Sequence, residues 1–80
     1  MNIKAAVVER IKELCFHRNI TVNTLANLAG VTPSTVYSML DSSRKDIGIV
    51  AIKKLCDGLD IQITDFFNAD LFNNLEQEIN

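Results

Sequence analysis

The feature that most constrains the fold lies at residues 21–40, where two short helical patterns are separated by Ala-Gly-Val-Thr-Pro. Gly30 accepts a positive φ at no steric cost, so it can end the first helix in the left-handed conformation. Thr32 is a good N-cap, and Pro33 suits the first helical position, where its missing N–H costs nothing. Because so little chain links them, the two helices are expected to meet at a tight corner.

Apolar residues recur at helical spacing along most of the chain, which predicts an all-α fold of five helices. The expected helices cover residues 3–17, 22–29, 32–41, 49–59 and 63–68, with Asn19 ending the first and Thr21 capping the second. No strand pattern or repeat is present. Ala26 is expected at a close helix crossing because of its small size. The residues expected to face the core are Ile3, Val7, Ile11, Leu14, Leu25, Leu28, Ala29, Val36, Met39, Leu40, Ile49, Ile52, Leu55, Cys56, Leu59, Phe66 and Phe67.

Composition points to a single small globular domain. The chain has 80 residues, of which 48% are hydrophobic and 22% charged, and 80 residues suffice for one modest core. No apolar run is long enough for a membrane span, and charged residues interrupt the N-terminal segment where a signal peptide would be apolar, so we expect a cytoplasmic protein with no membrane partner.

The two cysteines and the single histidine do not indicate chemistry. Cys15 and Cys56 each lie within an apolar helical stripe and are expected to be buried and reduced. With only His17 beside them they make no zinc pattern, and no nucleophile, base and carboxylate form a convincing set. We therefore expect no enzyme activity, no metal and no cofactor.

Charge is distributed unevenly along the chain. Residues 1–54 hold all eight basic residues and four acids, whereas residues 55–80 hold six acids and no base. A basic body with an acidic end is consistent with a polyanionic partner, although the net charge of the whole chain is −2. Lys4, Arg10, Lys12, Arg18, Lys53 and Lys54 are interpreted as ordinary exposed residues, although Arg18 could reach the backbone of such a partner.

Polar side chains share the exposed face of the helix at 32–41. Ser34, Tyr37, Ser38 and Asp41 follow the spacing i, i+3, i+4 and i+7. With the core pattern of Thr21, Leu25-Ala26, Ala29-Gly30-Val31, Val36 and Leu40, residues 10–67 resemble a single Cro/repressor-type (XRE-type) helix-turn-helix domain. This resemblance implies binding of double-stranded DNA by a homodimer, with the second helix of the pair in the major groove.

The resemblance also implies site residues. Pro33, Ser34, Tyr37 and Ser38 would face bases, and Thr21, Asn23, Thr35, Arg44 and Lys45 would hold phosphates. The chain is expected to be a sequence-specific transcriptional regulator and, more specifically, a repressor. Asp60, where the family usually has Gly, would have to adopt the left-handed conformation.

Two residues favour an alternative. Val22 replaces a Gln that often binds phosphate in the family, and Asp41 places a negative charge near the DNA backbone. They favour a protein-interaction module, or an antitoxin-like regulator with a regulatory protein partner, on the same fold with weak or lost DNA binding.

Residues 69–80 are assigned to a C-terminal tail that follows a DNA-binding domain at residues 1–68. Leu71, Phe72, Leu75 and Ile79 form an apolar stripe in this tail. The tail either folds back on its own domain or pairs with a second chain, and dimerisation is the favoured interpretation because it suits a symmetric DNA site.

Overall fold

The computed structural model describes residues 1–79, so Asn80, the last residue of the predicted tail, lies outside the described residues. Five α-helices and one short 3-10 helix follow one another, and the described residues contain no strand. The elements are α1 (Ile3–Arg18), α2 (Val22–Ala29), α3 (Pro33–Leu40), α4 (Ile49–Gly58), α5 (Ile63–Phe67) and η1 (Asp70–Phe72). The predicted all-α, five-helix fold is confirmed.

The helices begin where local signals predict. Thr21 accepts a hydrogen bond from the Thr24 amide at 3.1 Å, and Thr32 accepts one from the Thr35 amide at 3.3 Å, so each hydroxyl satisfies one of the unpaired amides of a first helical turn. Asn2 plays the same part for α1. Pro33 occupies the first position of α3.

Three helices end in the same way. Asn19, Gly30 and Asp60 each adopt a left-handed conformation, with φ of 54°, 70° and 56°. The next residue in each case is β-branched and donates its amide back to a carbonyl of the last helical turn, which completes a Schellman motif. Those next residues, Ile20, Val31 and Ile61, also pack against the core. The expectations for Asn19, Gly30 and Asp60 are confirmed.

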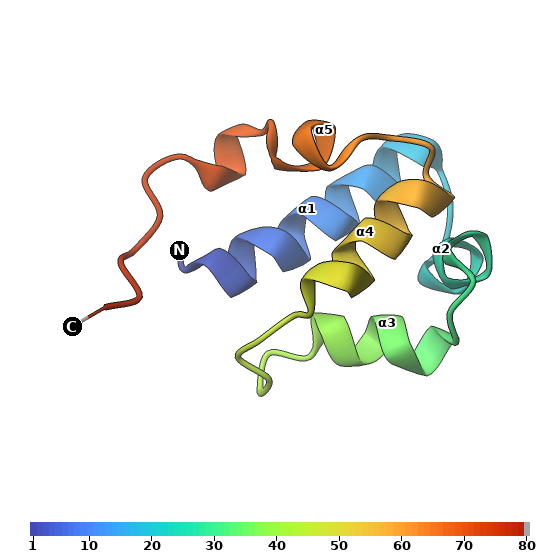
Figure 1. Cartoon of the computed structure of the whole chain (residues 1–80), viewed down its shortest axis with the longest axis horizontal. Coiled ribbons are helices and arrows are strands. Elements are labelled where there is room, and N and C mark those ends of the chain that lie inside the picture. The colour runs from blue at the N-terminus through green and yellow to red at the C-terminus, as the bar shows by residue number, and fades with distance from the viewer. Residues whose placement is uncertain (80) are drawn as a thin grey trace.

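The core lies between α1, α4 and the α2–α3 pair and takes residues from all five helices (Figure 1). Its largest fully buried side chains are Phe66, Ile11, Leu25, Leu55, Leu59 and Val36. α2 packs against α3 and α4, so the corner is supported from behind by α4. Ala26 is completely buried, as its small size predicted.

Three residues predicted to face the core are exposed. Leu28 in α2 is 53% exposed and Ile49 in α4 is 63% exposed. Both residues lie near the end of their helix. There the apolar side of the helix extends beyond the neighbouring elements that cover the rest of it. Ile3 is 37% exposed and borders, with Ile49, an apolar cleft of about 300 Å³ at the start of α1 and α4.

The tail is not a regular helix. Beyond η1, residues 73–74 form a turn in which Asn74 has a φ of 61°, and no further helix follows in the described residues. The predicted stripe therefore separates: Phe72 packs on Phe67 with ring centroids 4.9 Å apart, whereas Ile79 is 79% exposed. Glu76 then joins the N-terminus, donating its amide to the Met1 carbonyl and pairing its carboxylate with the Met1 ammonium at 3.0 Å. None of the described helices is long and apolar enough to cross a membrane.

Candidate nucleic-acid interface

The corner between α2 and α3 is fixed by backbone hydrogen bonds. The Gly30 amide donates to the Asn27 carbonyl at 3.2 Å, and the Val31 amide donates to the Ala26 carbonyl at 3.0 Å. The chain then becomes extended at Thr32 and re-enters a helix at Pro33. The two helices of the corner are therefore held at a defined angle by residues whose conformations are set locally.

The N-terminus of α3 carries a cluster of hydroxyl groups. The Thr32 Oγ1 lies 3.0 Å from the Ser34 Oγ and 3.0 Å from the Thr35 Oγ1. All three side chains belong to exposed residues. Since hydroxyls both donate and accept, this cluster can meet base edges or phosphate oxygens, and the unpaired amides of the first helical turn favour an anion beside it.

The predicted base-contacting residues lie along the outer side of α3. Ser34 is exposed, Tyr37 is 55% exposed, and Pro33 and Ser38 are half-buried. The opposite side of the helix buries Val36 and Met39. The structure thus places Ser34, Tyr37 and Ser38 on the outer side of one helix, as their spacing predicted, and Pro33, which the resemblance added, at its first position. Thr32, which the sequence had marked only as a cap, lies beside them.

The predicted phosphate-contacting residues come from three places. Thr21 and Asn23 are exposed at the start of α2, Thr35 lies in the first turn of α3, and Arg44 and Lys45 are exposed in the loop after α3. The Arg44 Nε lies 4.0 Å from the Asp41 Oδ2. In this pair the positive charge of Arg44 partly offsets the negative charge of Asp41.

Asp41 itself has a structural task. Its Oδ1 accepts hydrogen bonds from the Ser43 amide at 2.9 Å and the Ser43 hydroxyl at 2.8 Å, which closes a turn at the end of α3. The two Ser43 bonds, backbone first, hold the pKa of the Asp41 carboxyl below its usual value, and Arg44 and Lys4 lower it further. Val22 is half-buried and packs against the core, so it too has a role in the fold.

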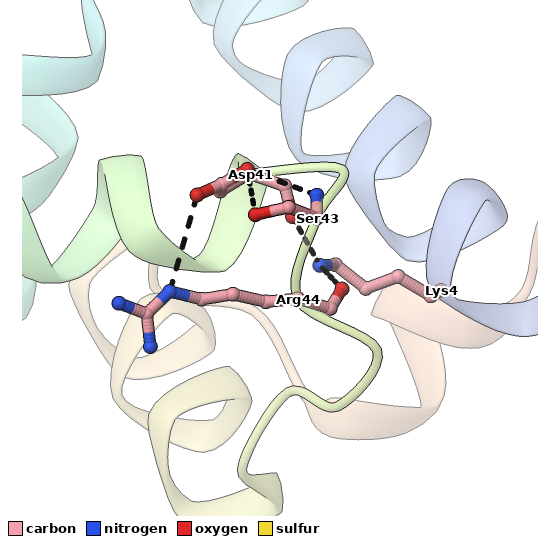
Figure 2. A network of polar contacts seen from close by, with 4 residues as sticks. All are labelled: Lys4, Asp41, Ser43 and Arg44. Atoms are coloured by element: carbon pink, nitrogen blue, oxygen red, sulfur yellow. Dashed lines mark hydrogen bonds and ion pairs between the residues drawn. The ribbon is translucent and has the colours of Figure 1, made fainter.

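Three basic residues of α1, which the sequence predicted on a solvated face, hydrogen-bond within the protein; Lys4 and Arg10 are half-buried, whereas Arg18 is exposed as predicted. Each donates to backbone carbonyls at the end of a different segment, where the helix dipole favours a cation. The Arg10 Nε bonds to the Phe66 carbonyl at 2.7 Å, and the Arg18 Nη2 bonds to the Leu59 carbonyl at 2.7 Å. The third, Lys4, reaches the loop after α3 (Figure 2).

Residues 1–79 contain no group of three or more His, Cys, Asp or Glu side chains that could hold a metal ion. Cys15 and Cys56 are free and buried, and burial raises the pKa of both thiols. They contribute to the core as small apolar residues.

Comparison with known proteins gives two matches. The family model for the Cro/C1-type HTH DNA-binding domain matches residues 10–70. The crystal structure of the prophage Lp1 protein 11 is similar, with 36% sequence identity and a TM-score of 0.80, over 94% of this chain and 100% of that chain. A search of curated proteins finds no match.

Proposed function

Since this chain belongs to the family of Cro/C1-type helix-turn-helix DNA-binding domains, we propose that it is a sequence-specific transcriptional repressor. In this proposal α3 enters the major groove of duplex DNA, and the protein acts in the cytoplasm as a homodimer on a symmetric site. Repression follows from occupying an operator. The proposal requires no catalytic residue and no cofactor.

The observation that carries the proposal is the polar outer side of α3. This helix of eight residues buries Val36 and Met39 on one side and exposes Ser34 and Tyr37 on the other. Helices that enter the major groove contact bases through the residues of their N-terminal half, where this helix carries its hydroxyl cluster. Pro33, Ser34, Tyr37 and Ser38 would contact bases.

Phosphate contacts would hold α3 in the groove. Thr21, Asn23 and Thr35 would contribute hydroxyl and amide groups, and Arg44 and Lys45 would contribute charge. Such contacts set register and affinity but carry no sequence information. The division of labour therefore predicts that variants on α3 change which DNA is bound, whereas variants in the loop change how strongly any DNA is bound.

The alternative is a protein-interaction module or antitoxin-like regulator with lost DNA binding. The two residues that favoured it, Val22 and Asp41, both have structural roles, in the core and in the turn after α3. Neither role requires that DNA binding be lost. DNA binding is accordingly the first function to test, and a chain that binds no DNA would favour the alternative.

The test is selection of bound sequences from a random duplex DNA library with the full chain, followed by affinity measurements at several salt concentrations. We expect an enriched motif with two-fold symmetry. Ser34→Ala combined with Ser38→Ala should lower the affinity for that motif about tenfold, since each hydroxyl hydrogen bond contributes about 0.5–1.5 kcal/mol. The melting temperature should change little because Ser34 is exposed and Ser38 is only half-buried.

Charge variants separate phosphate contact from net charge. Arg44→Gln with Lys45→Gln should reduce the salt dependence of binding, by about 0.9 in the log–log slope for each phosphate that the variant no longer neutralises. Lys53→Gln with Lys54→Gln makes the same change in net charge on α4 and should leave the slope nearly unchanged. A wild-type chain that fails to bind mixed duplex DNA even at low salt would refute the proposed function.

A further inference from the structure

The Lys4 side chain joins the start of the chain to the loop that follows α3. Its Nζ donates to the Asp41 carbonyl at 2.8 Å and to the Arg44 carbonyl at 2.5 Å, across 37 and 40 residues of sequence. Figure 2 shows the amine lying between the two carbonyls, with the Asp41 and Arg44 side chains directed away from it. Two of the three donors of the ammonium are therefore used within the protein.

The loop has few other ties to the rest of the molecule. Residues 41–46 are all exposed, and their remaining hydrogen bonds stay within the turn or reach only the end of α3. In the described chain, Lys4 is the one side chain from another element that hydrogen-bonds to these six residues. Ile47, which follows them, packs against the core and fixes the far end of the loop.

The two carbonyls that Lys4 binds define the turn. The Asp41 carbonyl also accepts the Arg44 amide at 3.1 Å, so Lys4 and Arg44 converge on the same oxygen. Without the ammonium, that turn would keep only the hydrogen bonds between its own residues, which are all exposed to water. If the loop were disordered in the free protein, ordering Arg44 and Lys45 on binding would cost conformational entropy and so lower the affinity for DNA.

We infer that Lys4 is a positioning residue for DNA binding: it holds the loop at residues 41–46 in the conformation that presents Arg44 and Lys45 to the phosphate backbone. This inference rests on the proposed function for the role of the loop, but the ordering of the loop by Lys4 is a property of the free protein. The rival is direct contact of the Lys4 ammonium with a phosphate.

The first measurement uses the protein without DNA. Lys4→Met keeps most of the aliphatic stem and removes the ammonium, and Lys4→Arg restores a donor with positive charge. Lys12→Met is the matched control, because Lys12 lies on the same helix and pairs only with Glu9 at 3.7 Å. Backbone nitrogen relaxation should show increased motion of the amides of residues 42–46 in Lys4→Met, partial recovery in Lys4→Arg, and no change in Lys12→Met.

The second measurement is a double-mutant cycle with DNA. Lys4→Met should weaken binding about fivefold to tenfold in the wild-type background, an interaction of the size that coupled neighbours show. In a background of Arg44→Ala with Lys45→Ala, the same substitution should have almost no effect, because the ordered loop no longer carries the charges. Circular dichroism melting of each variant shows whether the fold is retained.

Two results would overturn the inference. Unchanged loop motion in Lys4→Met would show that Lys4 does not order the loop. An equal drop in affinity in both backgrounds would show that the Lys4 ammonium contacts DNA itself. If the wild-type chain bound no DNA, the proposed function would fail, and the relaxation measurement would still decide whether Lys4 orders the loop.

Discussion

Gly58 in α4 lies directly against Ala29 in α2: a Cβ placed on Gly58 would stand 2.7 Å from the Ala29 amide nitrogen and 2.9 Å from its Cα. The atoms it would meet are backbone atoms, which cannot move aside as the end of a flexible side chain can. Ala29 is also the last residue of α2 before the left-handed Gly30. The close approach at Gly58 therefore sets how α4 supports the corner that carries α3.

Gly58→Ala should lower the free energy of unfolding by about 1–3 kcal/mol, the usual cost of overpacking. The gain in helix propensity, about 1 kcal/mol, offsets only part of the clash. Gly48→Ala is the matched control, since a Cβ at Gly48 meets nothing within 4 Å. Urea denaturation measures both. Equal stability of the Gly58→Ala variant and the wild type would show that the two helices separate easily.

Glycine is favoured at position 30 because of its left-handed backbone conformation and not because of limited space. Its φ is 70°, yet a Cβ there would meet nothing within 4 Å. Gly30→Ala should therefore cost about 1–2 kcal/mol through left-handed strain. Gly30→Asn should cost clearly less, because Asn19 already adopts this conformation at the end of α1. Thermal melting compares the two, and a similar decrease for both would mean that space, not φ, makes glycine necessary.

The difference between Gly30 and Gly58 shows what the sequence could predict. Gly30 follows a short helical pattern and precedes a cap and a proline, so its role is local and was predicted correctly. Gly58 lies inside a helical pattern, and nothing near it in sequence marks α2 as its neighbour. Helix ends, caps and the outer side of α3 were predictable for the same reason: their causes lie within a few residues.

Long-range partners were not predictable. Lys4, Arg10 and Arg18 were predicted to lie on a solvated face because nothing near them in sequence marks their hydrogen-bond partners. The carbonyls that they bind lie 37–56 residues away. Helical spacing identified the apolar side of α4 but not how much of that side the neighbouring helices cover. Ile49 was therefore wrongly assigned to the core. Residue type and spacing predicted the exposed side of α3 and the site residues proposed on it. Their contacts with DNA stay a prediction.

The turn at Asp41 predicts a pH response. Ser43 donates its amide and hydroxyl to Asp41, so the pKa of this carboxyl lies below its usual value of about 3.9. A lowered pKa means that the carboxylate stabilises the folded turn above the unfolded-state pKa, and that this contribution is lost as pH falls through the folded-state pKa. An NMR titration of the Asp41 side-chain carbon measures the pKa directly.

Ser43→Ala should raise the pKa of Asp41 toward its usual value, because the hydroxyl bond is removed while the amide bond can remain. Ser42→Ala is the control, since Ser42 is the neighbouring residue and donates nothing to Asp41 among the described hydrogen bonds. If the pKa of Asp41 were the same in wild type and Ser43→Ala, the hydroxyl would not contribute to holding the carboxylate in the turn.

The first part of the tail is bound to the domain it follows. η1 packs against α1, and the Phe72 ring lies 6.2 Å from Phe66 and 4.9 Å from Phe67. Removing residues 69–80 as a whole would uncover these rings, and the resulting instability would hide any effect on association. The question of whether the tail forms a dimer therefore needs a cut placed after Phe72.

Deleting residues 75–80 keeps Phe72 and removes Leu75, Glu76 and the exposed Ile79. If these residues join two chains, the mass in solution should fall from dimer to monomer, as measured by light scattering across a range of concentrations. Glu76→Gln in the full chain is the control, because it weakens the pairing with the Met1 ammonium while leaving the apolar side chains in place. A truncated chain with the same mass as the full chain would place any dimer contact outside residues 75–80, and the exposed Ile49 beside Ile3 would be the next surface to substitute.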